Sequence, residues 1–169
     1  MEQNKFKRII KHLLSTRHKV LNCFPKKELN KIEYMISQSE KQHMAEILCV
    51  IESGWDLKSL YREKNTRERA LEWFGLTQCW DTELNTGVLI YVSFADKQIE
   101  IIADRGIAKL VSNEIWQNIC TDISMLFKQG SYPEGINVGL EKVDAVLTNT
   151  IPRNHIPYHN QYPNQVIII

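Results

Sequence analysis

Two apolar strands separated by a helix constrain the fold of this chain more than any other feature. Residues 47–51 (ILCVI) form a continuous apolar run, which is typical of a central strand covered on both faces. A helical pattern then opens near Thr66 and Glu68 and ends near Gly75, before a second apolar run at residues 88–94. Because a crossover helix connects the two strands, we expect them to lie parallel.

The second strand leads into the clearest hairpin of the sequence. A turn at residues 95–98 joins it to a third strand at 99–102. Helical patterns precede the strands at residues 6–24 and 25–36, and others follow at 112–130 and 133–147. The order predicts an α/β fold in which helices cover both faces of a small mixed β-sheet. The final apolar run, residues 166–169, either adds an edge strand or covers a core rim.

Composition is that of one globular domain. The chain has 169 residues, of which 43% are hydrophobic and 24% charged. The formal net charge of +1 hides an asymmetry, because residues 1–27 hold eight Lys or Arg and only one acidic residue. The rest of the chain is correspondingly acidic, so any electrostatic partner has to meet a local surface.

The basic charge gathers on the first helical pattern. An apolar stripe (Phe6, Ile9, Ile10, Leu13 and Leu14) predicts that this helix packs on the domain with its basic face outward. The candidate contact residues on that face are Lys7, Arg8, Lys11, Arg17 and Lys19. They predict either a solvated surface or one that meets an anionic protein or an anionic membrane surface. Nucleic acid is disfavoured, since no aromatic residues interleave with the basic ones.

Several classes of protein lack support in the sequence. No signal peptide or spanning segment is recognisable, and we expect a soluble, cytoplasmic protein. The four cysteines lie far apart, which favours reduced thiols over a metal knuckle or a dithiol redox pair. The nucleotide-binding and hydrolase signatures GxxxxGK[ST], GxGxxG, GxSxG and HExxH are missing.

Five short segments together resemble one known family. They are SEKQHMAEI (39–47), ALEWFG (70–75), WD (80–81), NTGVLIYV (85–92) and ADKQIEIIADRGI (95–107). In this order and spacing they resemble the TPM domain family over residues 37–148. A leading helix pair and the tail NQYPNQV (160–166) are similar to a subgroup of soluble bacterial members.

The resemblance implies a mixed sheet of about four strands sandwiched between helices. It divides the chain into an N-terminal amphipathic helix pair packed on the domain (1–36), a TPM-like α/β domain (37–150) and a Pro/Asn-rich tail (151–169). Family members are linked to divalent-cation binding, notably calcium, and a plant member to acid-phosphatase activity. This chain has Ala103, Asp104, Arg105 and Gly106 where many members have Gly-x-Gly-x-Glu.

Strand topology predicts where polar residues meet. The starts of the first two strands and the end of the third share one edge of the sheet. The residues at that edge are His43, Glu46, Asp81, Asn85, Asp104 and Arg105. Glu52 and the Asp96 turn fall at the opposite edge. Simpler roles are open for each residue: Asp81 and Asp104 as cap or turn residues, Arg105 as an ion-pair partner, His43 and Glu46 as strand-edge groups.

If these carboxylates converge, their repulsion has to be offset, either by a bound cation or by Arg105 without any metal. Four candidate ligands, His43, Glu46, Asp81 and Asp104, favour Ca²⁺ or Mg²⁺, while an imidazole would suit Zn²⁺ or Mn²⁺. We therefore expect a binding module with a divalent-cation or small-ligand cleft at one sheet edge. One alternative is a metal-dependent, acid-phosphatase-like hydrolase with Glu46 or Asp81 as base and Arg105 holding phosphate. The other is a scaffold that uses the basic N-terminal helix.

Overall fold

The structure, a computed structural model, describes residues 2–154, 157 and 163–169. In chain order its elements are α1 (Glu2–Leu13), α2 (Arg17–Cys23), α3 (Lys26–Ser39), β1 (Glu46–Glu52), α4 (Leu57–Tyr61), α5 (Thr66–Leu76), β2 (Gly87–Ser93), β3 (Gln98–Ala103), α6 (Arg105–Ala108), α7 (Asn113–Lys128), α8 (Tyr132–Thr150) and β4 (Val166–Ile168). The expected mixed sheet between helices is confirmed. The first three residues of the predicted tail motif, 160–162, lie outside the described residues.

The four strands form one mixed sheet in the order β3-β2-β1-β4. β1 runs parallel to β2, which in turn pairs antiparallel with β3. The parallel pair and the hairpin expected from the sequence are therefore both present. β4 pairs parallel with the end of β1, at Cys49, Val50 and Ile51, so the terminal apolar run is an edge strand.

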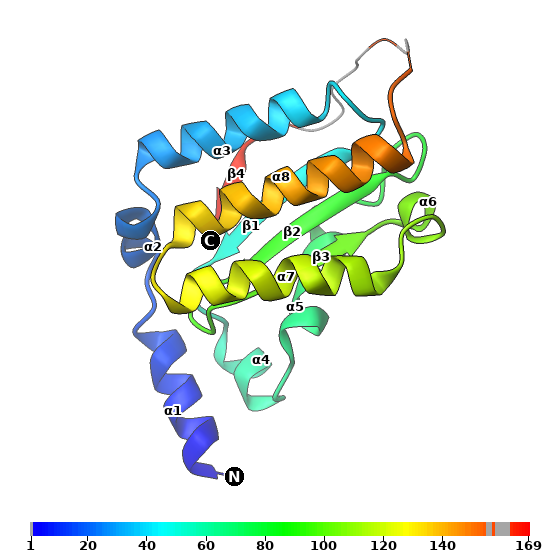
Figure 1. The fold of residues 1–169 in the computed structure, drawn as a ribbon. Coiled ribbons are helices and arrows are strands. Elements are labelled where there is room, and N and C mark those ends of the chain that lie inside the picture. The colour runs from blue at the N-terminus through cyan, green and yellow to red at the C-terminus, as the bar shows by residue number, and fades with distance from the viewer. Residues whose placement is uncertain (1, 155–156, 158–162) are drawn as a thin grey trace.

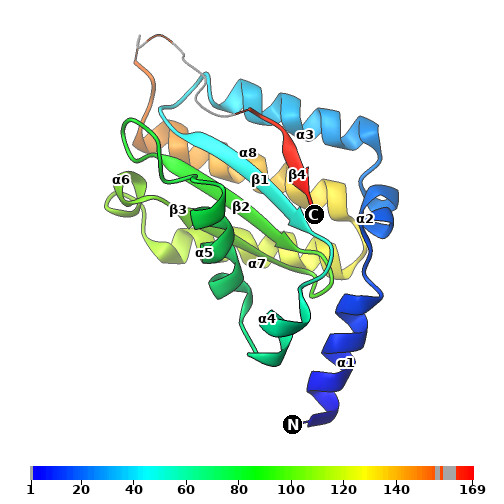
Figure 2. The same cartoon turned by 180° about the vertical axis from the view of Figure 1, so that it is seen from behind.

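The two faces of the sheet are covered unequally (Figures 1 and 2). α3, α8 and α7 lie across one face and close the larger core. That core includes Val20 of α2, Phe24 at the C-terminal end of α2, and Ile32 of α3, so α2 and α3 share it with the sheet. α5 covers the opposite face, where Ala70 packs against β1 and β2 in a smaller core. The even-numbered residues of β1, such as Leu48 and Val50, face this smaller core, because successive side chains of a strand alternate between its two faces.

The predicted helix at residues 6–24 is wrong in one respect, because the structure divides it into α1 and α2. Helix α1 ends at Leu13, and α2 begins after Thr16, whose side chain accepts a hydrogen bond from the Lys19 amide. Threonine is a good N-cap residue, and a cap with extended backbone stops the preceding helix from continuing.

The orientation expected for the first helix is also wrong. The basic side of α1 turns toward the body, where Arg8 contacts Asp96 and the His12 side chain is buried. Its apolar residues Phe6 and Leu13 stay exposed. A helical pattern identifies which face is apolar, but long-range partners decide which face the body contacts. Arg8 is thus an internal contact rather than an outer docking residue.

Candidate functional site

Three strand ends lie side by side at the edge where β1 begins. Glu46 of β1 is in register with Gly87 of β2, and the amide of Asp104 donates to the Gly87 carbonyl at 2.9 Å. In a pleated sheet, residues in register project to the same face. Glu46 and Asp104 therefore flank Gly87 on the face that α5 covers.

Gly87 makes room between the two acidic residues for Cys79. A Cβ atom at position 87 would lie 1.7 Å from the Cys79 carbonyl oxygen and 3.2 Å from its Sγ. Burial, and to a smaller extent the neighbouring charges of Asp104 and Glu46, raise the pKa of the Cys79 thiol to about 12. This edge therefore combines two carboxylates with a neutral, buried thiol.

The two carboxylates are shielded from water to different degrees. Glu46 is buried, with 3% of its surface exposed, and Asp104 is half-buried. Asp104 caps α6, since its Oδ1 accepts from the Arg105 amide at 2.7 Å. Its Oδ2 is buried and has no hydrogen-bond partner within the described part of the chain. A buried carboxylate oxygen without a donor is energetically costly, so this atom keeps an unused acceptor position.

The other residues expected at this edge lie nearer the surface. Arg105 is exposed and donates from Nε to Asn85 Oδ1 at 2.8 Å. The Asn85 carbonyl accepts from the Gly106 amide at 2.9 Å, so the loop before β2 and the start of α6 are joined. Asp81 is exposed in the loop between α5 and β2. The guanidinium of Arg105 is thus held by Asn85 at this edge, on a residue that is exposed to solvent.

His43 is fully buried and has partners at both ring nitrogens. Nδ1 accepts from the Ala45 amide at 3.2 Å, and Nε2 lies 2.8 Å from Ser39 Oγ. Burial lowers the pKa of His43 to about 4, partly opposed by the charge of Asp144. The ring is therefore neutral near pH 7 with its proton on Nε2, because Nδ1 is an acceptor. The donor nitrogen, Nε2, therefore faces Ser39 on α3 and, beyond it, Asp144 on α8.

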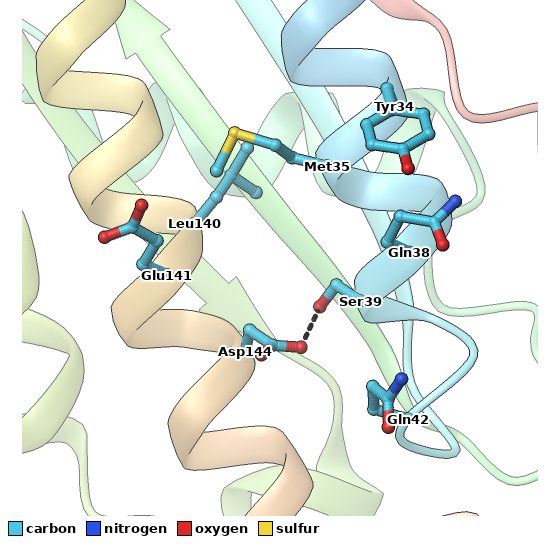
Figure 3. A pocket seen from close by; sticks show the side chains of 8 residues that line it. All are labelled: Tyr34, Met35, Gln38, Ser39, Gln42, Leu140, Glu141 and Asp144. Atoms are coloured by element: carbon cyan, nitrogen blue, oxygen red, sulfur yellow. Dashed lines mark hydrogen bonds between the residues drawn. The ribbon is translucent and has the colours of Figure 1, made fainter.

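Beside His43, α3 and α8 enclose a pocket of about 380 Å³ that the sequence did not indicate (Figure 3). The residues that line it are Tyr34, Met35, Gln38, Ser39, Gln42, Leu140, Glu141 and Asp144. Ser39 donates to Asp144 Oδ1 at 2.6 Å across the pocket. Helix spacing alone gives no signal for this pair, since the two residues are 105 positions apart.

The direction of the hydrogen bonds in this pocket does not activate Ser39 as a nucleophile. In a catalytic triad the hydroxyl donates to the imidazole, which removes its proton. Here the neutral His43 donates to Ser39, and Ser39 donates to Asp144. The imidazole cannot act as base toward Ser39 in this arrangement, so the network stabilises the junction of α3, α8 and β1.

Known proteins resemble this chain in both sequence and fold. The profile of the TPM domain matches residues 20–146, which is most of the chain. The chain belongs to the TPM domain family. A solved structure with this fold is the NMR structure of BA42 protein from the psychrophilic bacterium Bizionia argentinensis. It is 29% identical, with a TM-score of 0.73 over 85% of this chain and 93% of that chain. No curated protein matches significantly.

The opposite edge of this TPM domain holds a buried ion pair. Glu52 is 2% exposed and accepts from Arg69 Nε at 3.0 Å, from Trp73 Nε1 at 2.9 Å and from the Tyr91 hydroxyl at 2.5 Å. The sequence placed Glu52 at this edge without a partner. Three donors from the protein itself converge on this carboxylate and occupy its acceptor positions. The cluster therefore stabilises the smaller core.

The family's link to divalent cations can be tested on the residues present. Across residues 2–154, 157 and 163–169, no three His, Cys, Asp or Glu side chains are grouped to hold a metal ion. Glu46 and Asp104 nevertheless supply two carboxylates, one with an unpartnered oxygen. Such a pair fits a hard cation that keeps several waters. In the described part of this TPM domain, no helix is long and apolar enough to cross a membrane.

Proposed function

We propose that this TPM domain is a binding module whose sheet edge holds a divalent cation through Glu46 and Asp104. The observation that supports it is the buried Oδ2 of Asp104, which has no hydrogen-bond partner among the described residues. A second buried carboxylate, Glu46, lies across Gly87 from it. Carboxylates that share one sheet edge repel each other, and a cation coordinated by both removes that repulsion.

The donor set favours Mg²⁺ or Ca²⁺ over a transition metal. Carboxylate oxygens are hard ligands, and Mg²⁺ is commonly held by one or two carboxylates together with water. His43, which a zinc or manganese site would use, is engaged with Ala45 and Ser39. Asp81 lies in the neighbouring exposed loop, from which it is a candidate to complete the coordination.

Phosphoester hydrolysis is the alternative at the same edge. It needs the cation to polarise a phosphoryl oxygen, and Arg105 is the group available to hold the anion. The exposure of Arg105 beside Asp104 supports this assignment. Because hydrolysis depends on the cation, binding is the property to measure first.

Thermal unfolding with added cations tests the proposal. A ligand that binds only the folded state at about a hundredfold above its Kd adds roughly 2.7 kcal/mol, which raises the Tm of a domain of this size by about 5–10 °C. Asp104→Asn keeps an oxygen that can cap α6 and removes the charge, so this shift should disappear. Asp122→Asn changes a carboxylate on α7 that pairs with Lys142 away from this edge, and it is the matched control. Unchanged Tm values with Mg²⁺, Ca²⁺, Mn²⁺ and Zn²⁺ would refute the proposal.

A further inference from the structure

The polar side of α1 is fixed to the body of the domain. The guanidinium of Arg8 donates to Asp96 Oδ2 at 2.8 Å and to the Lys64 carbonyl at 3.1 Å, and it lies over the Trp55 ring at 4.5 Å. Lys5 pairs with Glu63 at 3.0 Å. Positions 5, 8 and 12 share one face of a helix, and this face meets the body.

The apolar side of the same helix is left in solvent. Phe6 is 64% exposed, Leu13 59% and Leu14 60%, and Ile10 is also exposed. Both views show α1 extending away from the sheet and from α3, α7 and α8 (Figures 1 and 2), with only its polar side near α4. An amphipathic helix normally buries its apolar stripe against its own domain. This one is held with that stripe outward, as a surface that an external partner would cover.

The charges around the stripe decide between partners. Lys7, Lys11 and Lys19 are exposed on α1 and α2, with Lys11 Nζ 4.0 Å from Asp96. Residues 1–27 hold eight Lys or Arg against one acidic residue, and of these basic residues Lys5 and Arg8 pair with the body. A second copy placed on this stripe would bring two strongly basic segments together, which repel each other. An anionic lipid surface offers an apolar layer for the stripe and negative headgroups for the flanking lysines.

We propose that α1 docks this protein in the plane of an anionic lipid surface, with Phe6, Ile10, Leu13 and Leu14 inserted. The contacts of Arg8 and Lys5 fix the polar side of α1 to the domain, so the rest of the domain would lie on the aqueous side of the lipid surface. This role is independent of the cation site, since Glu46 begins β1, whereas α1 contacts Trp55 and Asp96 beyond the other end of that strand.

Vesicle sedimentation of the full chain tests this surface. The wild type should bind vesicles of equal parts phosphatidylglycerol and phosphatidylcholine, release them partly at high salt, and bind pure phosphatidylcholine much more weakly. The double variant Phe6→Ser, Leu13→Ser should lower binding at least about tenfold, because two large side chains no longer insert. The control, Leu76→Ser with Leu110→Ser, changes equally exposed leucines outside α1 and should bind like the wild type.

Three results would overturn the proposal. Failure of the wild type to bind anionic vesicles removes the lipid surface as partner and leaves an acidic protein as the alternative. Equal binding by the Phe6, Leu13 variant shows that the stripe does not insert. A dimer in sedimentation equilibrium that the same variant abolishes shows that a second copy covers the stripe.

Discussion

Arg8 and Asp96 join the N-terminal helix to the turn between β2 and β3 across 88 positions of sequence. Two nitrogens of the guanidinium donate to the carboxylate, and His12 Nε2 lies 3.1 Å from Oδ1. Burial of Asp96 raises its pKa, but the contacts with His12 and Arg8 outweigh burial and hold it well below the usual range. This ion pair fixes the direction of α1, and with it the exposure of the apolar stripe.

Replacing Asp96 by Asn should loosen α1. We expect a loss of about 1–2 kcal/mol in the free energy of unfolding, since Arg8 and His12 lose a partly buried charged partner. Because folding lowers the pKa of Asp96, its contribution to the free energy of unfolding depends on pH. The contribution is complete above the unfolded-state pKa of about 3.9 and is lost as the pH falls through the folded-state pKa. Urea titrations across this acid range measure both effects, and an Asn variant with wild-type stability and amide exchange in α1 would contradict them.

Arg69 should matter far more than its sequence neighbour Arg67. Arg69→Met leaves the buried Glu52 without its cation, and removing one partner of a buried pair costs about 3–5 kcal/mol. Arg67 pairs with Glu100 at 3.2 Å nearer the surface, so Arg67→Met should cost less than about 1 kcal/mol. Chemical denaturation of both variants compares these losses directly. Equal losses would mean that Glu52 does not depend on Arg69.

Two glycines should respond in opposite directions to alanine. A Cβ at Gly87 would lie 1.7 Å from the Cys79 carbonyl oxygen, so Gly87→Ala must displace backbone and should cost at least about 3 kcal/mol. Gly75 lies within α5, and a Cβ there meets nothing within 4 Å. Gly75→Ala should therefore stabilise the protein by up to about 1 kcal/mol. Thermal or urea unfolding of the pair checks both signs, and a tolerated Gly87→Ala would disprove the close approach of Cys79.

His43 should make the folded state sensitive to mild acid. Its pKa is lowered to about 4, mainly by burial, so between about pH 6.5 and 4 the unfolded chain binds a proton that the folded chain does not. Stability should fall by up to about 3 kcal/mol as the pH drops through this range, and His43→Asn should flatten the slope. NMR titration of the ring reports the same value, and a His43 pKa near 6.5 would contradict the buried network.

The local sequence pattern was sufficient to predict the sheet, but it was insufficient to predict the orientation of α1. The runs at 47–51 and 88–94 predicted β1 and β2 because buried parallel strands are continuously apolar, and a single turn separates β2 from β3. The direction of α1 depends on Asp96, a partner that no periodicity indicates. Thr16 was a usable signal for the break in the first helix, since threonine favours the N-cap position.

The candidate site was predictable only to the level of topology. Strand order indicated that Glu46 and Asp104 share an edge, because parallel and antiparallel connections fix which strand ends meet. It could not indicate that His43 turns to Ser39, because side-chain direction in a loop depends on tertiary contacts. The pocket between α3 and α8 was missed for the same reason: Ser39 and Asp144 meet only when the two helices pack.

An NMR titration with Mg²⁺ tests the proposed cation site most directly. If Glu46 and Asp104 hold the ion, amide shifts should saturate and concentrate at Gly87 and at residues 104–106, with smaller changes near Asp81. The acidic cluster of Glu52 and Glu72 at the opposite edge serves as an internal control and should not respond, because Arg69 occupies it. Shifts that stay absent at Gly87 and 104–106 with both Mg²⁺ and Ca²⁺, or that appear equally at all exposed carboxylates, would contradict the account.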